Sequence, residues 1–158
     1  MPDSIQQLAD SLSELRRFWE RPDRKRRFLA ELGEPIEFGV LRALIAVDRH
    51  RDGSPGRSGP GVSDVAATLS IDTSTASRLL DQAVGVGYIV RVPEPDDRRR
   101  THLEVTDEGR RVLDRANAIR HRWLTEITAG WSAGEVERLA ELLTRFVADA
   151  TSDSPEGA

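Results

Sequence analysis

The chain has 158 residues, and 38% hydrophobic against 32% charged residues is the composition of a one-domain protein that folds in water. No apolar run reaches the roughly 20 residues of a membrane span, and the N-terminus lacks a secretory signal, so we expect a cytoplasmic protein. The absence of cysteine excludes disulfides and thiol-based redox sensing. Because His50, His102 and His121 are not spaced as metal ligands, we expect neither a metal nor a cofactor.

The charge of the chain is unevenly distributed. A formal net charge of −4 by itself argues against nucleic acid as a partner. However, residues 16–27 hold seven basic residues against two acidic ones, a net charge of +5, and residues 98–100 are three consecutive arginines. Residues 135–158 carry six acidic residues against two basic ones, a net charge of −4. The chain therefore has basic segments that could meet an anionic partner.

The first third of the chain predicts three helices. Apolar residues recur every three or four positions over 5–19, which indicates an amphipathic helix that ends near Arg21, since the residue before a proline avoids helical dihedral angles. A short helix is expected over 24–32, and the apolar-rich segment 36–49 predicts a mostly buried helix. Residues 50–61, with four glycines and two prolines, predict a loop.

The next segment has the spacing of a helix-turn-helix. We expect a short helix with Ser63 as its N-cap, a break at 70–72, and a second helix over 73–84 that Gly85 and Gly87 end. Residues 88–92 and 101–105 then predict the two strands of a β-hairpin. A helix-turn-helix followed directly by a hairpin is a winged helix.

Two long amphipathic helices follow the hairpin. Thr106 is the expected N-cap of the first, which keeps one apolar stripe over 112–127. Ser132 is the expected N-cap of the second, with apolar residues over 136–147. The last residues, 151–158, read as a disordered tail.

The expected fold is therefore mainly α with a small β-hairpin wing. Residues of about 36–105 form a winged helix-turn-helix lobe, and residues of about 5–32 and 107–150 form N- and C-terminal dimerisation helices. A lobe of roughly 70 residues cannot cover the stripes of these helices, so we expect a homodimer. A monomeric helical bundle is the alternative.

One face of the second helix of the helix-turn-helix is suited to double-stranded DNA. At about 100° per residue, Ala76, Leu79, Leu80 and Ala83 share one side, whereas Ser74, Arg78 and Asp81 point away from it. Short hydroxyls and an arginine suit phosphates and base edges. The predicted contacts from the helix-turn-helix are Ser63, Thr73, Ser74, Thr75, Ser77 and Arg78. Alternatively the hydroxyls are caps on a solvated face, and Asp81 favours that interpretation.

The tip of the hairpin carries the second set of predicted contacts. Arg98, Arg99 and Arg100 on a wing suit the minor groove, whose negative potential attracts guanidinium groups. Asp97 has the wrong sign for phosphate, and we expect it to orient an arginine through a bidentate ion pair. A solvated charge run is the usual alternative for such a stretch.

The run 62–113 resembles the MarR family of winged helix-turn-helix transcriptional regulators. The matching motifs are STASRLLD in the second helix, the G-Y-I-V step into the hairpin, D-x-R at Asp97 and Arg99, and L-x-V-T-D-x-G-R at the exit from the hairpin. The resemblance implies a homodimer on a near-palindromic operator, usually a repressor, often relieved by a small anionic or aromatic effector. The chain departs from the family in its longer loop at 50–61 and in the net charge of 62–105, where five basic residues stand against seven acidic ones.

No phosphate-binding loop or nucleophile elbow is present, so we expect no enzyme. A non-specific architectural DNA-binding protein and a helical protein-interaction scaffold without effector are the alternatives.

Overall fold

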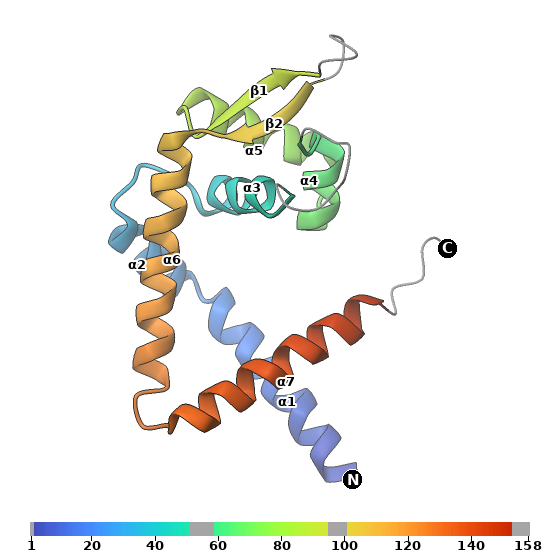
Figure 1. The fold of residues 1–158 in the computed structure, drawn as a ribbon, viewed down its shortest axis with the longest axis vertical. Coiled ribbons are helices and arrows are strands. Elements are labelled where there is room, and N and C mark those ends of the chain that lie inside the picture. The colour runs from blue at the N-terminus through green and yellow to red at the C-terminus, as the bar shows by residue number, and fades with distance from the viewer. Residues whose placement is uncertain (1, 51–58, 95–100, 153–158) are drawn as a thin grey trace. The chain divides into compact units, whose positions relative to one another are not determined.

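The computed structural model describes residues 2–50, 59–94 and 101–152 (Figure 1). Its described part contains seven helices and one antiparallel hairpin, so the predicted fold class is confirmed. The elements are α1 (Pro2–Glu20), α2 (Pro22–Leu32), α3 (Phe38–Arg49), α4 (Val62–Leu69), α5 (Thr73–Gly85), β1 (Ile89–Pro93), β2 (Thr101–Val105), α6 (Asp107–Ile127) and α7 (Ala133–Ser152). The chain divides into two compact units, 1–119 and 120–158.

Helix α3 is the centre of the first unit. It contacts α4, α5 and β2, and its buried residues are Val40, Leu41, Ala43, Leu44, Ala46 and Val47. Burial on several faces explains why its sequence is rich in apolar residues instead of showing a narrow stripe. Around it, α4, α5 and the hairpin complete a winged helix-turn-helix lobe (Figure 1).

The start of α4 differs from the prediction. Gly61 is the N-cap, and Ser63 is the exposed second residue of the helix. The cause is Asp64, whose Oδ2 accepts a hydrogen bond of 2.8 Å from the Gly61 backbone N–H. That bond places the N-cap two residues before Ser63, so the predicted capping role of Ser63 is wrong.

Helix α5 begins and ends within a residue or two of its predicted bounds. Ser70 adopts a left-handed conformation, with φ 53°, at the turn between α4 and α5. Helix α5 includes Gly85, and the chain then turns at Gly87, with φ 80°. Of the two glycines expected to end the helix, only Gly87 thus adopts the left-handed conformation that favours glycine.

The hairpin pairs Ile89 with Val105 and Pro93 with Thr101. Strand β2 has the predicted bounds, whereas β1 begins and ends one residue later than predicted. The cause is Tyr88, which does not pair within the hairpin. Its N–H donates to Ala83 O and its carbonyl accepts from Thr106 N.

Strand β2 is buried on both faces near its middle. Leu103 lies on the predicted inner face, but His102 on the opposite face is buried as well. The end of the loop at 59–61 covers it: a Cβ on Gly59 would lie 2.8 Å from the His102 ring, and Leu103 N donates to Pro60 O over 2.9 Å.

The start of α6 is tied to the end of α5. Thr106 is the N-cap, as predicted: its Oγ1 accepts from Gly109 N at 3.0 Å and donates to the carbonyl of Gly87 at 2.7 Å. Its own N–H donates to the carbonyl of Tyr88 at 3.1 Å. Gly109 lies directly against that same carbonyl, where a Cβ would overlap the oxygen. The joint between the lobe and α6 is therefore close-packed and held by several backbone hydrogen bonds.

Three other boundaries correct the predictions. Helix α2 begins at Pro22, two residues early, because a proline at the first helical position has the required φ and needs no hydrogen-bond acceptor. Helix α3 begins two residues late, after Glu37 in extended conformation. Helix α7 includes Thr151 and Ser152, which were predicted as tail; the rest of the tail, 153–158, lies outside the described residues.

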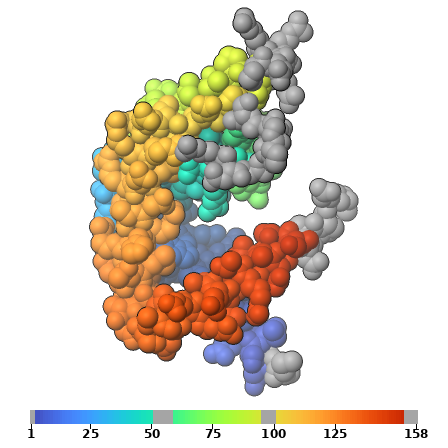
Figure 2. Space-filling view, viewed as in Figure 1, coloured from blue at the N-terminus to red at the C-terminus, as the bar shows by residue number. Residues whose placement is uncertain are grey.

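Helix α7 makes up most of the second unit. Ser132 is its N-cap, as predicted: its Oγ accepts from Glu135 N at 3.4 Å, and Glu135 Oε2 accepts from Ser132 N at 2.8 Å. None of the residues of α7 is buried, and its side chains lie at the surface in orange to red in Figure 2. The apolar residues thus exposed are Val136, Leu139, Leu142, Leu143, Phe146 and Val147.

No helix in the described ranges is both long and apolar enough to cross a membrane. Within the same ranges, no group of three or more histidine, aspartate or glutamate side chains is placed to hold a metal ion.

Candidate nucleic-acid interface

Helix α5 has the two faces that the sequence predicts. Ala76, Leu80 and Ala83 are fully buried against the lobe, whereas Ser74 and Arg78 are exposed. Leu79, expected on the inner side, is half-buried. The helix therefore presents a polar surface with a guanidinium group at its centre.

The N-cap of α5 is Asp72, a residue that the sequence interpretation missed. Its Oδ1 accepts from Thr75 N at 2.8 Å, its Oδ2 accepts from Thr75 Oγ1 at 2.7 Å, and Ser74 Oγ also donates to the carboxylate. The hydrogen bonds from Ser74 and Thr75 hold the pKa of Asp72 well below its usual range. An aspartate directly before a helix is a strong N-cap signal, and it could have found this residue.

The other predicted contact residues of the helix-turn-helix are not all equivalent. Thr73 is exposed at the first position of α5, and Ser77 is half-buried. The structure brings Ser74 and Thr75 together at Asp72, so both hydroxyls have a capping role in the free protein. Ser63 lies apart from them, on α4. The hydrogen bonds to Asp72 support the cap interpretation for Ser74 and Thr75, and contact of these hydroxyls with DNA stays a prediction.

The predicted wing residues Asp97, Arg98, Arg99 and Arg100 lie outside the described residues. Their contact with DNA and the ion pair expected of Asp97 stay predictions.

Asp81 has a partner on the hairpin. Arg91 Nη2 of β1 lies 2.7 Å from Asp81 Oδ1 of α5. The sequence interpretation took Asp81 as a sign of a solvated face, but the structure pairs it with a cation of the adjacent strand. The partner could not be found from helical periodicity, because it lies on another element.

The basic run 16–27 is less free than its net charge suggests. Three of its arginines form ion pairs: Arg16 with Glu20 at 3.0 Å, Arg21 with Asp23 at 3.2 Å, and Arg27 with Glu31 at 2.9 Å. The guanidinium of Arg24 lies 3.3 Å above the Phe18 ring. Glu31 lies outside the run and was not counted in its net charge. The net charge of +5 therefore overstated the positive charge available to a partner.

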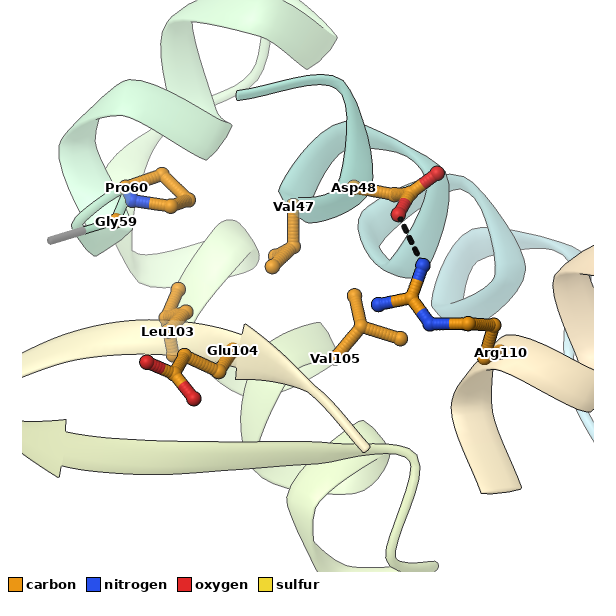
Figure 3. Close-up of a pocket in the computed structure, with 8 residues that line it drawn as sticks. All are labelled: Val47, Asp48, Gly59, Pro60, Leu103, Glu104, Val105 and Arg110. Atoms are coloured by element: carbon orange, nitrogen blue, oxygen red, sulfur yellow. Dashed lines mark hydrogen bonds and ion pairs between the residues drawn. The ribbon is translucent and has the colours of Figure 1, made fainter. Parts of the chain in front are cut away.

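A cavity of about 250 Å³ lies beside β2 (Figure 3). It is lined by Val47, Asp48, Gly59, Pro60, Leu103, Glu104, Val105 and Arg110. Arg110 Nη1 lies 3.3 Å from Asp48 Oδ1, so α6 and α3 are joined at its edge. The walls combine apolar side chains with the charged Asp48, Glu104 and Arg110, and the cavity contacts both the lobe and the first turn of α6.

A second link joins the lobe to α6. Tyr88 donates to Glu34 Oε2 at 3.1 Å, and Arg115 Nη2 of α6 lies 2.8 Å from Glu34 Oε1. Burial raises the pKa of Tyr88, and so does its hydrogen bond to Glu34. Glu34 thus connects the segment before α3, a residue between α5 and β1, and α6.

The comparisons with known proteins agree with this geometry. Residues 34–100 match the model of the MarR family. The HTH-type transcriptional regulator YdgJ of Bacillus subtilis is 31% identical over 84 residues, which are 53% of this chain and 51% of that protein. The multiple antibiotic resistance protein MarR of Escherichia coli is 29% identical over 85 residues, 53% of this chain and 59% of that protein. The matched part thus spans little more than half the length of these two relatives.

Solved structures agree over nearly the whole chain. A MarR family protein from Bacillus stearothermophilus has a TM-score of 0.78 at 18% identity, covering 96% of this chain and 98% of that one. RV1404 from Mycobacterium tuberculosis has a TM-score of 0.72 at 23% identity, covering 98% of each chain. The fold defines a winged helix-turn-helix protein. In sequence, residues 34–100 resemble the MarR family, and YdgJ is an HTH-type transcriptional regulator.

Proposed function

We propose that this chain is a sequence-specific DNA-binding transcriptional regulator that acts in the cytoplasm as a homodimer. The observation that carries the proposal is the polar face of α5, where exposed Arg78 lies opposite the fully buried Ala76 and Leu80. In a helix-turn-helix, the second helix is called the recognition helix, here α5, and its exposed face enters the major groove. A guanidinium there can bind the O6 and N7 atoms of guanine with two parallel hydrogen bonds.

The dimer is supported by the open apolar stripe of α7. Leu139, Leu143 and Phe146 are each about two-fifths exposed in the single chain. Covering such a stripe with a second copy removes apolar surface from water. A two-fold dimer presents two recognition helices, so it fits a near-palindromic operator with half-sites about one helical turn, roughly 10 base pairs, apart.

Repression relieved by a small effector is the finer part of the proposal. The cavity beside β2 is our candidate effector site, because a ligand there would contact the wing and the start of α6 together. A ligand carboxylate would compete with Asp48 for the guanidinium of Arg110. Such a ligand would act by favouring a dimer whose recognition helices are wrongly spaced.

The decisive experiment is to sequence DNA that the purified protein selects from a random pool, and to footprint the result. A regulator selects one short symmetric sequence and protects it. An architectural protein protects DNA of every sequence, and an interaction scaffold protects none. Either of the last two outcomes would overturn the proposed function.

A further inference from the structure

The pair of Arg91 and Asp81 joins the wing to the recognition helix. Arg91 Nη2 on β1 and Asp81 Oδ1 on α5 lie 2.7 Å apart. The Arg91 side chain is 32% exposed and that of Asp81 is 64% exposed. An ion pair this open contributes little to folding stability. Its effect must therefore be sought in the arrangement of the two elements that it joins.

Arg91 occupies a position that would suit an apolar residue. It pairs across the hairpin with Leu103, which is buried, and directly paired residues lie on the same face of a sheet. The inner face of β1 also includes buried Ile89. An arginine here can pack its aliphatic stem along the edge of the core while its charged end reaches Asp81.

The pair is the outer of two attachments between the hairpin and α5. At the base of the hairpin, Tyr88 N bonds to Ala83 O, and Thr106 holds the carbonyls of Gly87 and Tyr88. Two residues further along β1, Arg91 reaches Asp81. The bond from Leu103 N to Pro60 O also holds the hairpin, and the contact of Arg91 with Asp81 adds a restraint on its tilt against α5.

We propose that Arg91 and Asp81 are positioning residues that set the angle between the wing and the recognition helix. The inference rests on the proposed DNA-binding function. A wing already held at the correct angle loses less conformational freedom when helix and wing engage one duplex together. Asp81 thus supports DNA binding although its charge repels phosphate.

The test is a set of binding isotherms on the selected duplex for Asp81→Asn, Arg91→Met and the double variant. Arg91→Met keeps an apolar stem, and Asp81→Asn keeps the size of the side chain. We expect each single variant to weaken binding by about fivefold, with the thermal midpoint within a few degrees of wild type. The double variant should bind no worse than the weaker single variant, because all three lose the same contact.

The sign of the Asp81→Asn effect decides between positioning and simple electrostatics. If Asp81 acts only through its charge, removing it tightens DNA binding, and the effects of the two single variants add. Either result overturns the inference, as does wild-type binding by both single variants. Asp114→Asn removes the same charge from an exposed position of α6, and we expect wild-type binding. If the wild-type protein itself selects no DNA, the proposed function has failed, and not this inference.

Discussion

At the scale of single residues, we expect base recognition to depend most on Arg78, which is exposed on α5. We expect Arg78→Ala to cost about 1 to 3 kcal/mol on the selected duplex and to relax the preference at one position of each half-site. Arg78→Lys keeps the charge but loses the planar two-donor geometry of arginine. Compared with Arg78→Ala, it should therefore recover more of the affinity for scrambled DNA than of the affinity for the selected duplex. Isotherms on both duplexes measure the difference. An unchanged ratio of the two affinities in Arg78→Ala would show that Arg78 reads no base.

Tyr88 predicts how stability changes at high pH. Burial and the hydrogen bond to Glu34 raise its pKa in the folded protein, so the folded state keeps the phenol proton longer than the unfolded state does. This contribution is complete below the unfolded pKa of about 10 and is lost as pH rises through the folded pKa. We expect the denaturation midpoint of wild type to fall more steeply above pH 10 than that of Tyr88→Phe. Parallel pH profiles would contradict the assignment.

At the scale of elements, the joint between the lobe and α6 leaves no room for a methyl group at Gly109. Replacing glycine by alanine inside a helix ordinarily stabilises by about 0.5 to 1 kcal/mol. At Gly109 the new Cβ would overlap the carbonyl oxygen of Tyr88, so we expect Gly109→Ala to destabilise by about 1 to 3 kcal/mol. Gly134→Ala on α7 is the matched control, because nothing lies within 4 Å of its Cβ position. Chemical denaturation of both variants should give opposite signs.

The sequence predicted the elements better than their ends and their partners. Apolar periodicity identified the helices and the hairpin because it records which faces are buried. The observed helix ends differ from the predicted ones where a side chain forms a capping hydrogen bond. At the start of α4, for example, the Asp64 carboxylate accepts from the N–H of Gly61 and makes Gly61 the N-cap. The pairing of Asp81 with Arg91 joins two elements, so it depends on tertiary structure that no single helical pattern records. Asp72 is the exception, since its capping role was readable from the sequence.

At the scale of the whole molecule, the exposed stripe of α7 predicts the oligomeric state. Light scattering at micromolar concentration should give about twice the chain mass of 17.6 kDa. Leu143→Glu places a charge within the stripe, where burial would be costly, so this variant should be monomeric. Arg145→Glu introduces the same residue outside the stripe and should leave the dimer intact. A monomeric wild-type protein with all its helices formed would remove the argument for a symmetric operator.

If the proposed dimer forms, helix α7 should also link folding to protein concentration. It has 20 residues and none of them is buried in the single chain, whereas most of the stability of a helix in a protein comes from packing of its apolar face. If α7 is stable only within the dimer, its folding depends on protein concentration by mass action. Dilution separates the two copies and should unfold α7. The circular dichroism signal at 222 nm should then fall between micromolar and nanomolar protein. A cell that changes the abundance of this protein would thereby change how much of each molecule is folded, as well as how many molecules there are.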